Sequence, residues 1–194
     1  YIVGGAVRDR LLGHECKDYD IECFGITIDD FESAMEHLGA QGVGKSFFVY
    51  KYHDLDISLP RTEQKISKGH RGFEVSLATE EKEASRRRDF TINAMAYDLS
   101  SNRLIDPVDA YRDLKNKTIR MVSKDIFKQD PVRLLRAYRI AAEFQFEIES
   151  ETNAAIQRHA SLIQQSAGER ARAEFFKMLK CPGFHPYLRQ MADN

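Results

Sequence analysis

The sequence predicts an α/β protein of the α+β type, in which a small β-sheet domain precedes a helical domain. Three observations predict it. Polar and apolar residues alternate at 18–21 and 54–59, amphipathic helical patterns lie around these segments, and β-like patterns end near residue 122. From Lys124 onward only helical periodicity remains. We therefore expect one domain over residues 1–122 and an all-helical domain over 123–194.

The composition excludes some classes of protein. The 194 residues are 42% hydrophobic, enough for one or two domains with a core, and the net charge of −1 favours no particular partner. Three cysteines without Cys-x-x-Cys spacing indicate neither a disulfide framework nor a zinc site. Without a signal peptide or a long apolar run, we expect a cytoplasmic protein that does not cross a membrane. Because the chain starts inside a predicted strand without Met, we expect it to be part of a longer protein.

The first strand carries two carboxylates on one face. Asp18 and Asp20 share that face because successive strand residues point in opposite directions. Such a pair repels itself unless a cation lies between the oxygens, and Mg²⁺ is usually held by one or two carboxylates together with phosphates. If the strand at 54–59 is its neighbour, Asp56 supplies a third carboxylate for a two-metal site. A sheet with one solvated face would show the same alternation.

A phosphate-binding element is predicted just upstream. Residues 1–3 form a short apolar strand, Gly4 and Gly5 permit a tight turn, and residues 6–12 read as a helix closed by Gly13. A glycine turn that leads into a helix presents backbone N–H groups to an anion, and Arg8 adds a guanidinium. A nucleoside triphosphate with its Mg²⁺ requires such neighbouring phosphate and metal sites.

Other segments allow two interpretations. Residues 26–38 form an amphipathic helix, and residues 39–46 match the phosphate-binding pattern GxxxxGKS, although the preceding helix and the following β-prone residues favour a hairpin turn. Residues 60–72 lack periodicity and describe either a lid over a phosphate site or a solvated connection.

Two arginine-rich segments follow. In residues 86–95, burial of Phe90, Ile92 and Met95 would anchor Arg88 and Asp89 where they could meet a ribose and phosphates. Further on, Asp130 suits a helix N-cap with Pro131 as the first helical residue. Arg133, Arg136 and Arg139 then recur every third residue, either along a triphosphate and its base or as a solvated basic face. A capping-box pattern at 166–169 opens a helix over 170–179 that we interpret as structural.

Several of these motifs occur in a known order. The segments Gly4–Asp9, Asp18–Asp20, Arg87–Met95, Asp130–Arg139 and Glu169–Arg170 resemble the ordered motifs of class II CCA-adding tRNA nucleotidyltransferases and their bacterial poly(A) polymerase relatives. The resemblance covers residues 1 to about 180. It implies a polymerase-β-like head with a small mixed sheet, followed by a helical neck, and an enzyme that transfers CMP and AMP from CTP and ATP to the 3′ end of tRNA.

The resemblance also implies roles for individual residues. Asp18 and Asp20 would hold Mg²⁺; Asp56 is a further catalytic candidate from the strand pattern described above, not from the resemblance. Gly5 and Arg8 would contact the triphosphate. The complete nucleotide-binding set that it implies is Gly4, Gly5, Arg8, Arg88, Asp89, Asn93, Asp130, Arg133, Arg136 and Arg139. Within that set, Arg88 and Asp89 would meet the sugar region, Asp130 and Arg133 the base, and Arg136 and Arg139 the phosphates.

Hydrogen-bonding chemistry supports the assignment of the base. An ionised Asp only accepts hydrogen bonds and an Arg only donates them. Cytosine and adenine each present an amino donor beside a ring-nitrogen acceptor, whereas uracil and guanine present a carbonyl beside a ring N–H. Asp130 and Arg133 together therefore match C and A and leave groups unpaired against U and G, which can discriminate on the order of 10^4-fold.

The chain departs from the family pattern in two respects. Gln129 stands before Asp130 where the family usually has Glu, so the charge that could orient Arg133 is absent. The chain is also expected to end before the body and tail regions that grip tRNA. Poly(A) addition, CC-only or A-only addition, a non-catalytic RNA-binding module and a P-loop hydrolase that uses Lys45 stay open as alternatives.

Overall fold

The chain forms two compact units. The computed structural model describes residues 1–16, 18–43, 48–65, 73–78 and 80–194, with only the backbone of 61–65 and 73–76. Unit 1 comprises 1–88 and 93–108, and unit 2 comprises 89–92 and 109–194. The segment after Arg88 thus contributes four residues to unit 2 before the chain returns to unit 1 at Asn93. The predicted head region, residues 1–122, has a different boundary and stays a prediction.

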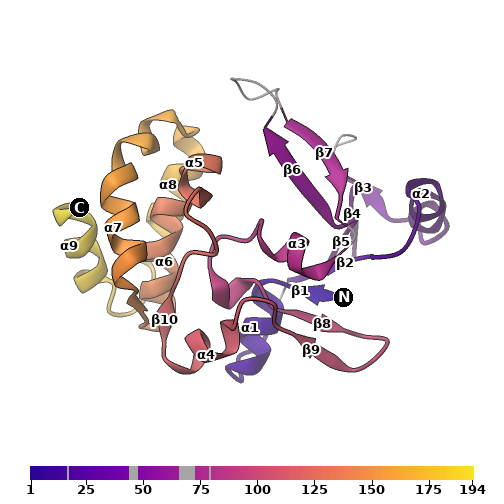
Figure 1. Cartoon of the computed structure of the whole chain (residues 1–194), viewed down its shortest axis with the longest axis horizontal. Helices are drawn as coiled ribbons and strands as arrows, with labels where there is room; N and C mark the ends of the chain where they lie inside the picture. Colours follow the sequence, from indigo (N-terminus) through magenta and orange to yellow (C-terminus); the bar gives the residue numbers. More distant parts are fainter. Residues whose placement is uncertain (17, 44–47, 66–72, 79) are drawn as a thin grey trace. The chain divides into compact units, whose positions relative to one another are not determined.

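Unit 1 is built on one mixed sheet (Figure 1). Seven strands among the described residues lie in the order β3-β4-β5-β2-β1-β8-β9. Strands β2 and β5 are parallel, and the other neighbouring pairs are antiparallel. The bounds are β1 Ile2–Val3, β2 Tyr19–Glu22, β3 Gln41–Gly42, β4 Val49–Tyr52, β5 Leu55–Ser58, β8 Ala96–Asp98 and β9 Arg103–Ile105. This confirms the small mixed sheet that the resemblance implied.

Helix α2 (Ile28–His37) covers one part of this sheet. Its Phe31 and Met35 are buried against Ile57 and Leu59 of the β5 segment. The helix starts two residues later than predicted because Thr27 is its N-cap, with a side-chain oxygen that accepts a hydrogen bond from the Asp30 amide. The amphipathic pattern of residues 26–38 is therefore explained by packing.

The remaining elements of unit 1 correct one prediction. Helix α1 (Gly5–Leu11) follows β1, and helix α3 (Glu81–Ser85) precedes Arg88; the 3-10 turn η1 (Thr91–Asn93) begins in unit 2 and ends where the chain returns to unit 1. Residues 60–72 were expected to be an irregular loop, but β6 (Arg61–Lys65) pairs antiparallel with β7 (Phe73–Leu77), while 66–72 lie outside the described residues. Strands in a ribbon pair through their backbones, and all five residues of β6 are polar or charged, so this strand shows no apolar alternation from which it could be predicted.

The GKS-containing segment is followed by a strand. Strand β3 pairs with β4 in a hairpin, with Gln41 opposite Lys51 and Gly42 opposite Tyr50. Gly44, Lys45 and Ser46 lie outside the described residues, but a P-loop requires a helix after the motif. The hairpin interpretation is therefore confirmed at its two ends.

Unit 2 is mainly helical, around a core that includes Phe127, Leu134, Tyr138 and Ile156. Its helices are α4 Ala110–Lys115, α5 Ile126–Gln129, α6 Arg133–Phe144, α7 Ser150–His159, α8 Gly168–Leu179 and α9 His185–Asp193, with the 3-10 segment η2 at Ala160–Gln165. In the described parts of both units, no helix has the length and apolar character needed to cross a membrane.

Three local expectations about unit 2 were wrong. Helices were expected alone beyond Lys124, but β11 (Glu147–Ile148) pairs in parallel with β10 (Thr118–Ile119), and two residues are too few to show alternation. Helix α6 begins at Arg133, because Asp130 forms a turn in which its carboxylate accepts a hydrogen bond from the Val132 amide. The capping box at 166–169 is absent, since the Ser166 hydroxyl donates to the Ile163 carbonyl.

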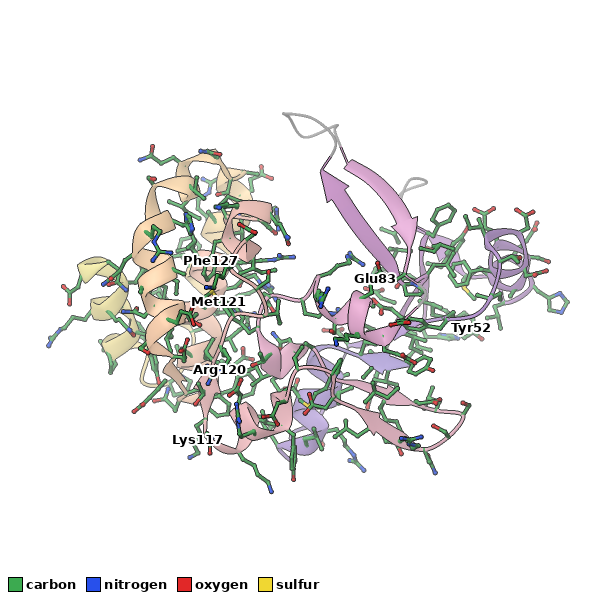
Figure 2. The ribbon with its side chains drawn as sticks, in the orientation of Figure 1. Tyr52, Glu83, Lys117, Arg120, Met121 and Phe127 are labelled. Atoms are coloured by element: carbon green, nitrogen blue, oxygen red, sulfur yellow. The ribbon has the colours of Figure 1, made fainter. Side chains whose placement is uncertain are left out.

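The start of helix α7 yields a prediction about acid stability. Glu149 is its N-cap and accepts hydrogen bonds from the Thr152 amide and hydroxyl, and it lies 3.4 Å from the Arg120 guanidinium. Figure 2 labels Arg120 and Met121 on the adjoining segment, and the Met121 amide donates to the Thr152 hydroxyl. Burial alone would raise the pKa of Glu149, but these donors outweigh it and hold the pKa below the ordinary glutamate value.

Replacement of this cap should make the free energy of unfolding less dependent on pH. A carboxylate with a lowered pKa stabilises the fold above its unfolded pKa, and that stability is lost as the pH falls through the folded value. We expect Glu149→Gln to lower the free energy of unfolding by about 1 kcal/mol at pH 7, a typical loss for an N-cap. The loss should be smaller at acid pH. Urea unfolding at both pH values measures it. The exposed Glu151→Gln is the matched control. An equal loss at both pH values would contradict the assignment.

Candidate active site

The carboxylates of the first and second Asp-x-Asp segments lie on adjacent strands. In the parallel pair of β2 and β5, Asp20 is opposite Asp56 and Ile21 is opposite Ile57. The two isoleucines belong to the apolar face that packs under α2, so the two aspartates point to the other face. The condition stated for Asp56, that the two strands are neighbours, is therefore met. Asp18, just before β2, is exposed, as is Asp20.

The charges of this face are only partly compensated. Lys51 on β4 is opposite Asp56 and lies 2.8 Å from its carboxylate, in a pair that is about half exposed. The surrounding protein removes part of the hydration of Asp20 and thereby raises its pKa, the negative charges of Asp56, Glu22 and Asp18 raise it further, and Arg88 opposes them. A cation bound beside Asp20 would relieve this repulsion.

These residues fit a magnesium ion that also binds phosphate. The described residues contain no group of three or more His, Cys, Asp or Glu side chains arranged to hold a metal by themselves. Mg²⁺ does not need one, because it is commonly bound through one or two carboxylates plus substrate phosphates. Asp18 and Asp20 meet that requirement as hard oxygen donors exposed on the sheet face. Asp56 as a third catalytic carboxylate stays a prediction.

A glycine turn adjoins these carboxylates. Gly4 has a φ of 72°, which disfavours other residues, and a Cβ there would lie 3.4 Å from Arg88 Nη1 and 3.5 Å from Asp20 Oδ2. The Gly4 amide already donates to the Met95 carbonyl. The expectation of bare amides therefore does not hold for Gly4. Binding of nucleotide by Gly4 and Gly5 stays a prediction.

Arg8 is held by the protein rather than extended into solvent. Its side chain is 9% exposed. Nη1 donates to Asn93 Oδ1 at 2.6 Å, and Nε donates to Asp9 Oδ1 at 2.8 Å. The guanidinium lies over the turn, because a Cβ on Gly5 would be 3.3 Å from Arg8 Nη2. Asn93, predicted to bind nucleotide, is buried and orients Arg8. The sequence offered no signal for this contact across 85 residues.

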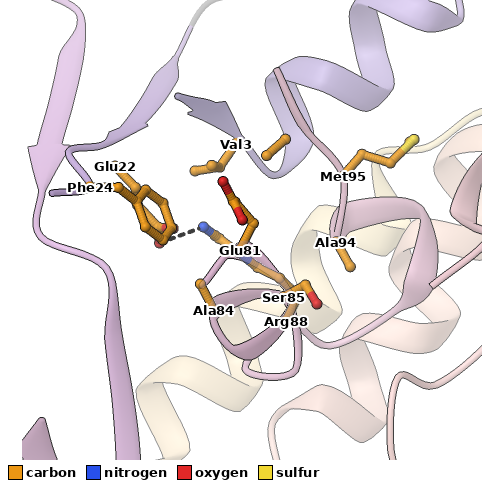
Figure 3. A pocket seen from close by; sticks show the side chains of 10 residues that line it. Val3, Glu22, Phe24, Glu81, Ala84, Ser85, Arg88, Ala94 and Met95 are labelled. Atoms are coloured by element: carbon orange, nitrogen blue, oxygen red, sulfur yellow. Dashed lines mark hydrogen bonds and ion pairs between the residues drawn. The ribbon is translucent and has the colours of Figure 1, made fainter. Parts of the chain in front are cut away.

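Arg88 is paired with an acid that sequence analysis did not select. Its Nη2 donates to Glu22 Oε1 at 2.8 Å, and Glu22 is buried on β2. Figure 3 shows the two side chains meeting beside a small pocket that Val3, Ala84 and Met95 also line. In the sequence, Glu22 follows Asp20 at the same two-residue spacing as Asp20 follows Asp18, so the pattern alone does not single it out as a partner of Arg88.

The neck arginines of unit 2 are tied to carboxylates. Asp89 is buried, and its Oδ2 accepts from Arg136 Nε at 2.7 Å. The buried Glu174 of α8 accepts from Arg139 Nε at 2.8 Å and lies 3.7 Å from Arg136. Glu143 completes the pairing of Arg139. Arg136 and Arg139 of α6 are therefore paired with carboxylates of the protein. The sequence had suggested either phosphate binding or a solvated basic face for these arginines, and neither interpretation included these ion pairs. Contacts of Asp89, Arg136 and Arg139 with nucleotide stay predictions.

The buried pair of Asp89 and Arg136 should stabilise unit 2 strongly. Arg136→Met would remove the guanidinium that pairs with the Asp89 carboxylate, which is 6% exposed, at a cost of roughly 3 kcal/mol in the free energy of unfolding. Asp89→Asn together with Arg136→Met removes both charges and should recover most of that loss, because breaking such a pair costs more than deleting it. Urea unfolding of the three chains measures this. A double variant no more stable than Arg136→Met would contradict it.

The predicted base-reading pair lies at the start of α6. Asp130 is held by Arg170 of α8 through Nη1–Oδ1 at 3.3 Å and Nη2–Oδ2 at 2.6 Å. Arg133 Nη1 donates to the Ile126 carbonyl and to Gln129 Oε1, both at 3.3 Å. Helix α8, interpreted from sequence as structural, thus supplies a guanidinium that orients Asp130. The motif Glu169–Arg170 was the only signal for it.

Comparisons with known proteins agree with this architecture. Residues 1–120 match the family described as "Poly A polymerase head domain", and residues 145–194 match "Probable RNA and SrmB- binding site of polymerase A". The "Multifunctional CCA protein" of Aromatoleum aromaticum is 45% identical over 157 residues, which is 78% of this chain and 37% of that protein. The "CCA-adding enzyme" of Streptococcus mutans is 36% identical over 194 residues, or 94% and 46% of the two chains.

Solved structures give the same result. The Bacillus stearothermophilus CCA-adding enzyme in complex with CTP is similar at a TM-score of 0.85 and 29% identity, over 100% of this chain and 47% of that one. The Thermotoga maritima CCA-adding enzyme complexed with tRNA gives 0.80 and 32%, over 99% and 45%. The fold, together with the aspartates on and beside β2, therefore places the chain in the class of nucleotidyltransferases with a head and a neck region.

The chain belongs to the poly A polymerase head-domain family. The resemblance stated from the motifs is therefore confirmed. The chain spans about two fifths of the length of the curated relatives that it matches.

Proposed function

We propose that the chain is the catalytic part of a Mg²⁺-dependent tRNA nucleotidyltransferase that adds CMP and AMP from CTP and ATP to the tRNA 3′ end and releases pyrophosphate. One observation carries the proposal. Asp20 and Asp56 are opposite each other on parallel strands, and Asp20 and Arg88 both adjoin the Gly4 turn. Relatives named for CCA addition support the choice of reaction.

The residues of unit 1 would bind the phosphates and the metal. Asp18 and Asp20 would hold Mg²⁺, and Asp56 would accept a hydrogen bond or share a second ion. Arg8 and Arg88 would neutralise phosphate charge, Arg8 from a position fixed by Asn93 and Asp9. Bound Mg²⁺ lowers the pKa of an attacking hydroxyl and stabilises the charge on a departing pyrophosphate. The two carboxylates are therefore the groups on which the rate should depend most.

The residues of unit 2 would select the base. Asp130 can accept a hydrogen bond from the amino group of C or A, and Arg133 can donate to the neighbouring ring nitrogen. Arg170 orients the Asp130 carboxylate through two hydrogen bonds. In U and G these donor and acceptor positions are reversed, so the same two side chains would reject them. The named substrate, tRNA, makes the cytoplasm the proposed location.

A product-length assay tests the proposal. The chain is incubated with tRNA that lacks all three, the last two or only the last nucleotide of its 3′ CCA, each with CTP, ATP or both, and the products are sized. Addition that stops after completing CCA is expected. A long adenosine ladder would instead show a poly(A) polymerase, the alternative favoured by the family descriptions of both matched regions. Partial products would show CC-only or A-only addition, and no extension with Mg²⁺ would contradict the proposal.

A further inference from the structure

A buried carboxylate lies on the active-site strand and is not used by the proposed chemistry. Glu22 is two residues beyond Asp20 on β2, on the same face, and it is 6% exposed. A buried charge is costly unless it is paired. Its partner is Arg88, whose Nη2 lies 2.8 Å from Glu22 Oε1. Glu22 is therefore placed to act through Arg88 rather than on a ligand directly.

The geometry of Arg88 shows what this pairing controls. The guanidinium is a rigid planar fork, so the position of one nitrogen constrains the direction of the others. Its Nη2 is bound to Glu22, while its Nη1 faces the glycine turn, 3.4 Å from where a Cβ on Gly4 would lie. Asp20 Oδ2 is 3.5 Å from that same point. Glu22 thus directs one arm of Arg88 toward the place where the turn and the carboxylate strand meet.

The residues around Arg88 do not by themselves fix the position of its side chain. Together with Glu22 and Arg88, a small and mostly apolar pocket is lined by Glu81, Ala84, Ser85 and Ala94 (Figure 3). Arg88 is one quarter exposed, so without its acid partner the long side chain could turn toward solvent. Orientation of the arginine therefore depends on Glu22 rather than on packing alone.

We propose that Glu22 is a positioning residue that holds the Arg88 guanidinium at the glycine turn so that it binds the phosphates of the incoming nucleotide. This inference rests on the proposed function and adds a residue to its nucleotide site. It predicts that removal of Glu22 weakens nucleotide binding only when Arg88 is present.

A double-mutant cycle on the 194-residue chain tests this prediction. The Kd for CTP with Mg²⁺ is measured by calorimetry for the wild type, Glu22→Ala, Arg88→Met and the double variant. In Glu22→Ala, Arg88 loses its orientation, and CTP binding should be weaker than in the wild type by about tenfold or more. Arg88→Met should weaken CTP binding at least as much. The double variant should bind like Arg88→Met alone, because Glu22 then has nothing to position.

Two further variants separate positioning from folding or general charge. Glu22→Gln keeps an acceptor at the same reach and should restore binding to within about threefold of the wild type, since a side-chain amide oxygen also accepts from Arg. Glu81→Gln removes a neighbouring negative charge from the same pocket and should leave binding unchanged. If Glu22→Ala does not fold, Glu22→Asp, which keeps the charge and shortens the side chain, takes its place in the cycle.

The outcomes distinguish the two proposals. A loss from Glu22→Ala that persists at full size in the Arg88→Met background would overturn the positioning role while the proposed function stands. So would a loss reproduced by Glu81→Gln. A wild-type chain that binds no CTP would instead overturn the proposed function and, with it, the positioning role.

Discussion

Replacement of Asp18 by alanine should lower the rate of nucleotide addition at least about a hundredfold, as the loss of a main electrostatic stabiliser does. Asp18 is one of the two carboxylates proposed to hold Mg²⁺. The fold should be unaffected, because Asp18 is exposed and precedes β2, and exposed substitutions usually change stability by less than about 0.5 kcal/mol.

Rate and metal binding should fall together in this variant. Single-turnover addition of CMP to tRNA that lacks its 3′ CCA measures the rate, and Mn²⁺ binding followed by electron paramagnetic resonance measures the metal site without turnover. Asp29→Asn, an exposed aspartate of α2, is the control and should retain both. Near-normal turnover by Asp18→Ala, with Mn²⁺ still bound, would refute the metal assignment.

The second large effect concerns the choice of base. Arg133→Ala should relax the rejection of UTP and GTP roughly tenfold to a hundredfold, the discrimination that one good bidentate contact provides, while it weakens CTP binding less. Asp130 should stay in place in this variant, because Arg170 and the Val132 amide hold its carboxylate. The remaining acceptor can then pair with any base that offers a donor.

Competition assays measure this directly. Incorporation of CMP against UMP from mixed nucleotides gives the discrimination ratio for the wild type and Arg133→Ala. Lys128→Ala removes a cation of α5 that pairs with Asp125 and should leave the ratio unchanged. Unchanged rejection of UTP and GTP by Arg133→Ala would count against the base-reading role and would leave the metal assignment untouched.

Much of the fold could be predicted because its signals are local. Alternation along 18–21 and 54–59 predicted which side chains share a face, and the glycines at 4, 5 and 13 predicted the turn and the end of α1. Elements without such signals were missed. Strand β6 carries no apolar residue and so no alternation, which left its pairing with β7 unpredicted, and β10 and β11 are two residues each. The start of α6 was placed too early because a turn at Asp130 resembles an N-cap in sequence.

The candidate site was likewise predicted only in part from the sequence. The ordered motifs predicted the family, and comparison with known proteins confirmed it. The chemical type of each candidate residue followed from its side chain alone. What each arginine binds did not, since Arg88 pairs with Glu22, Arg136 with Asp89 and Arg170 with Asp130 across 66, 47 and 40 residues.

The linear chain was enough to specify the class of fold, the acidic face of the first strand and the kind of chemistry, because these depend on residue type and on the two-residue or 3.6-residue period of a single element. Only the folded molecule settled which acid neutralises which arginine and that Asp20 is opposite Asp56. Such partners depend on strand register and helix packing, and these arise from burial of apolar faces over the whole of each unit.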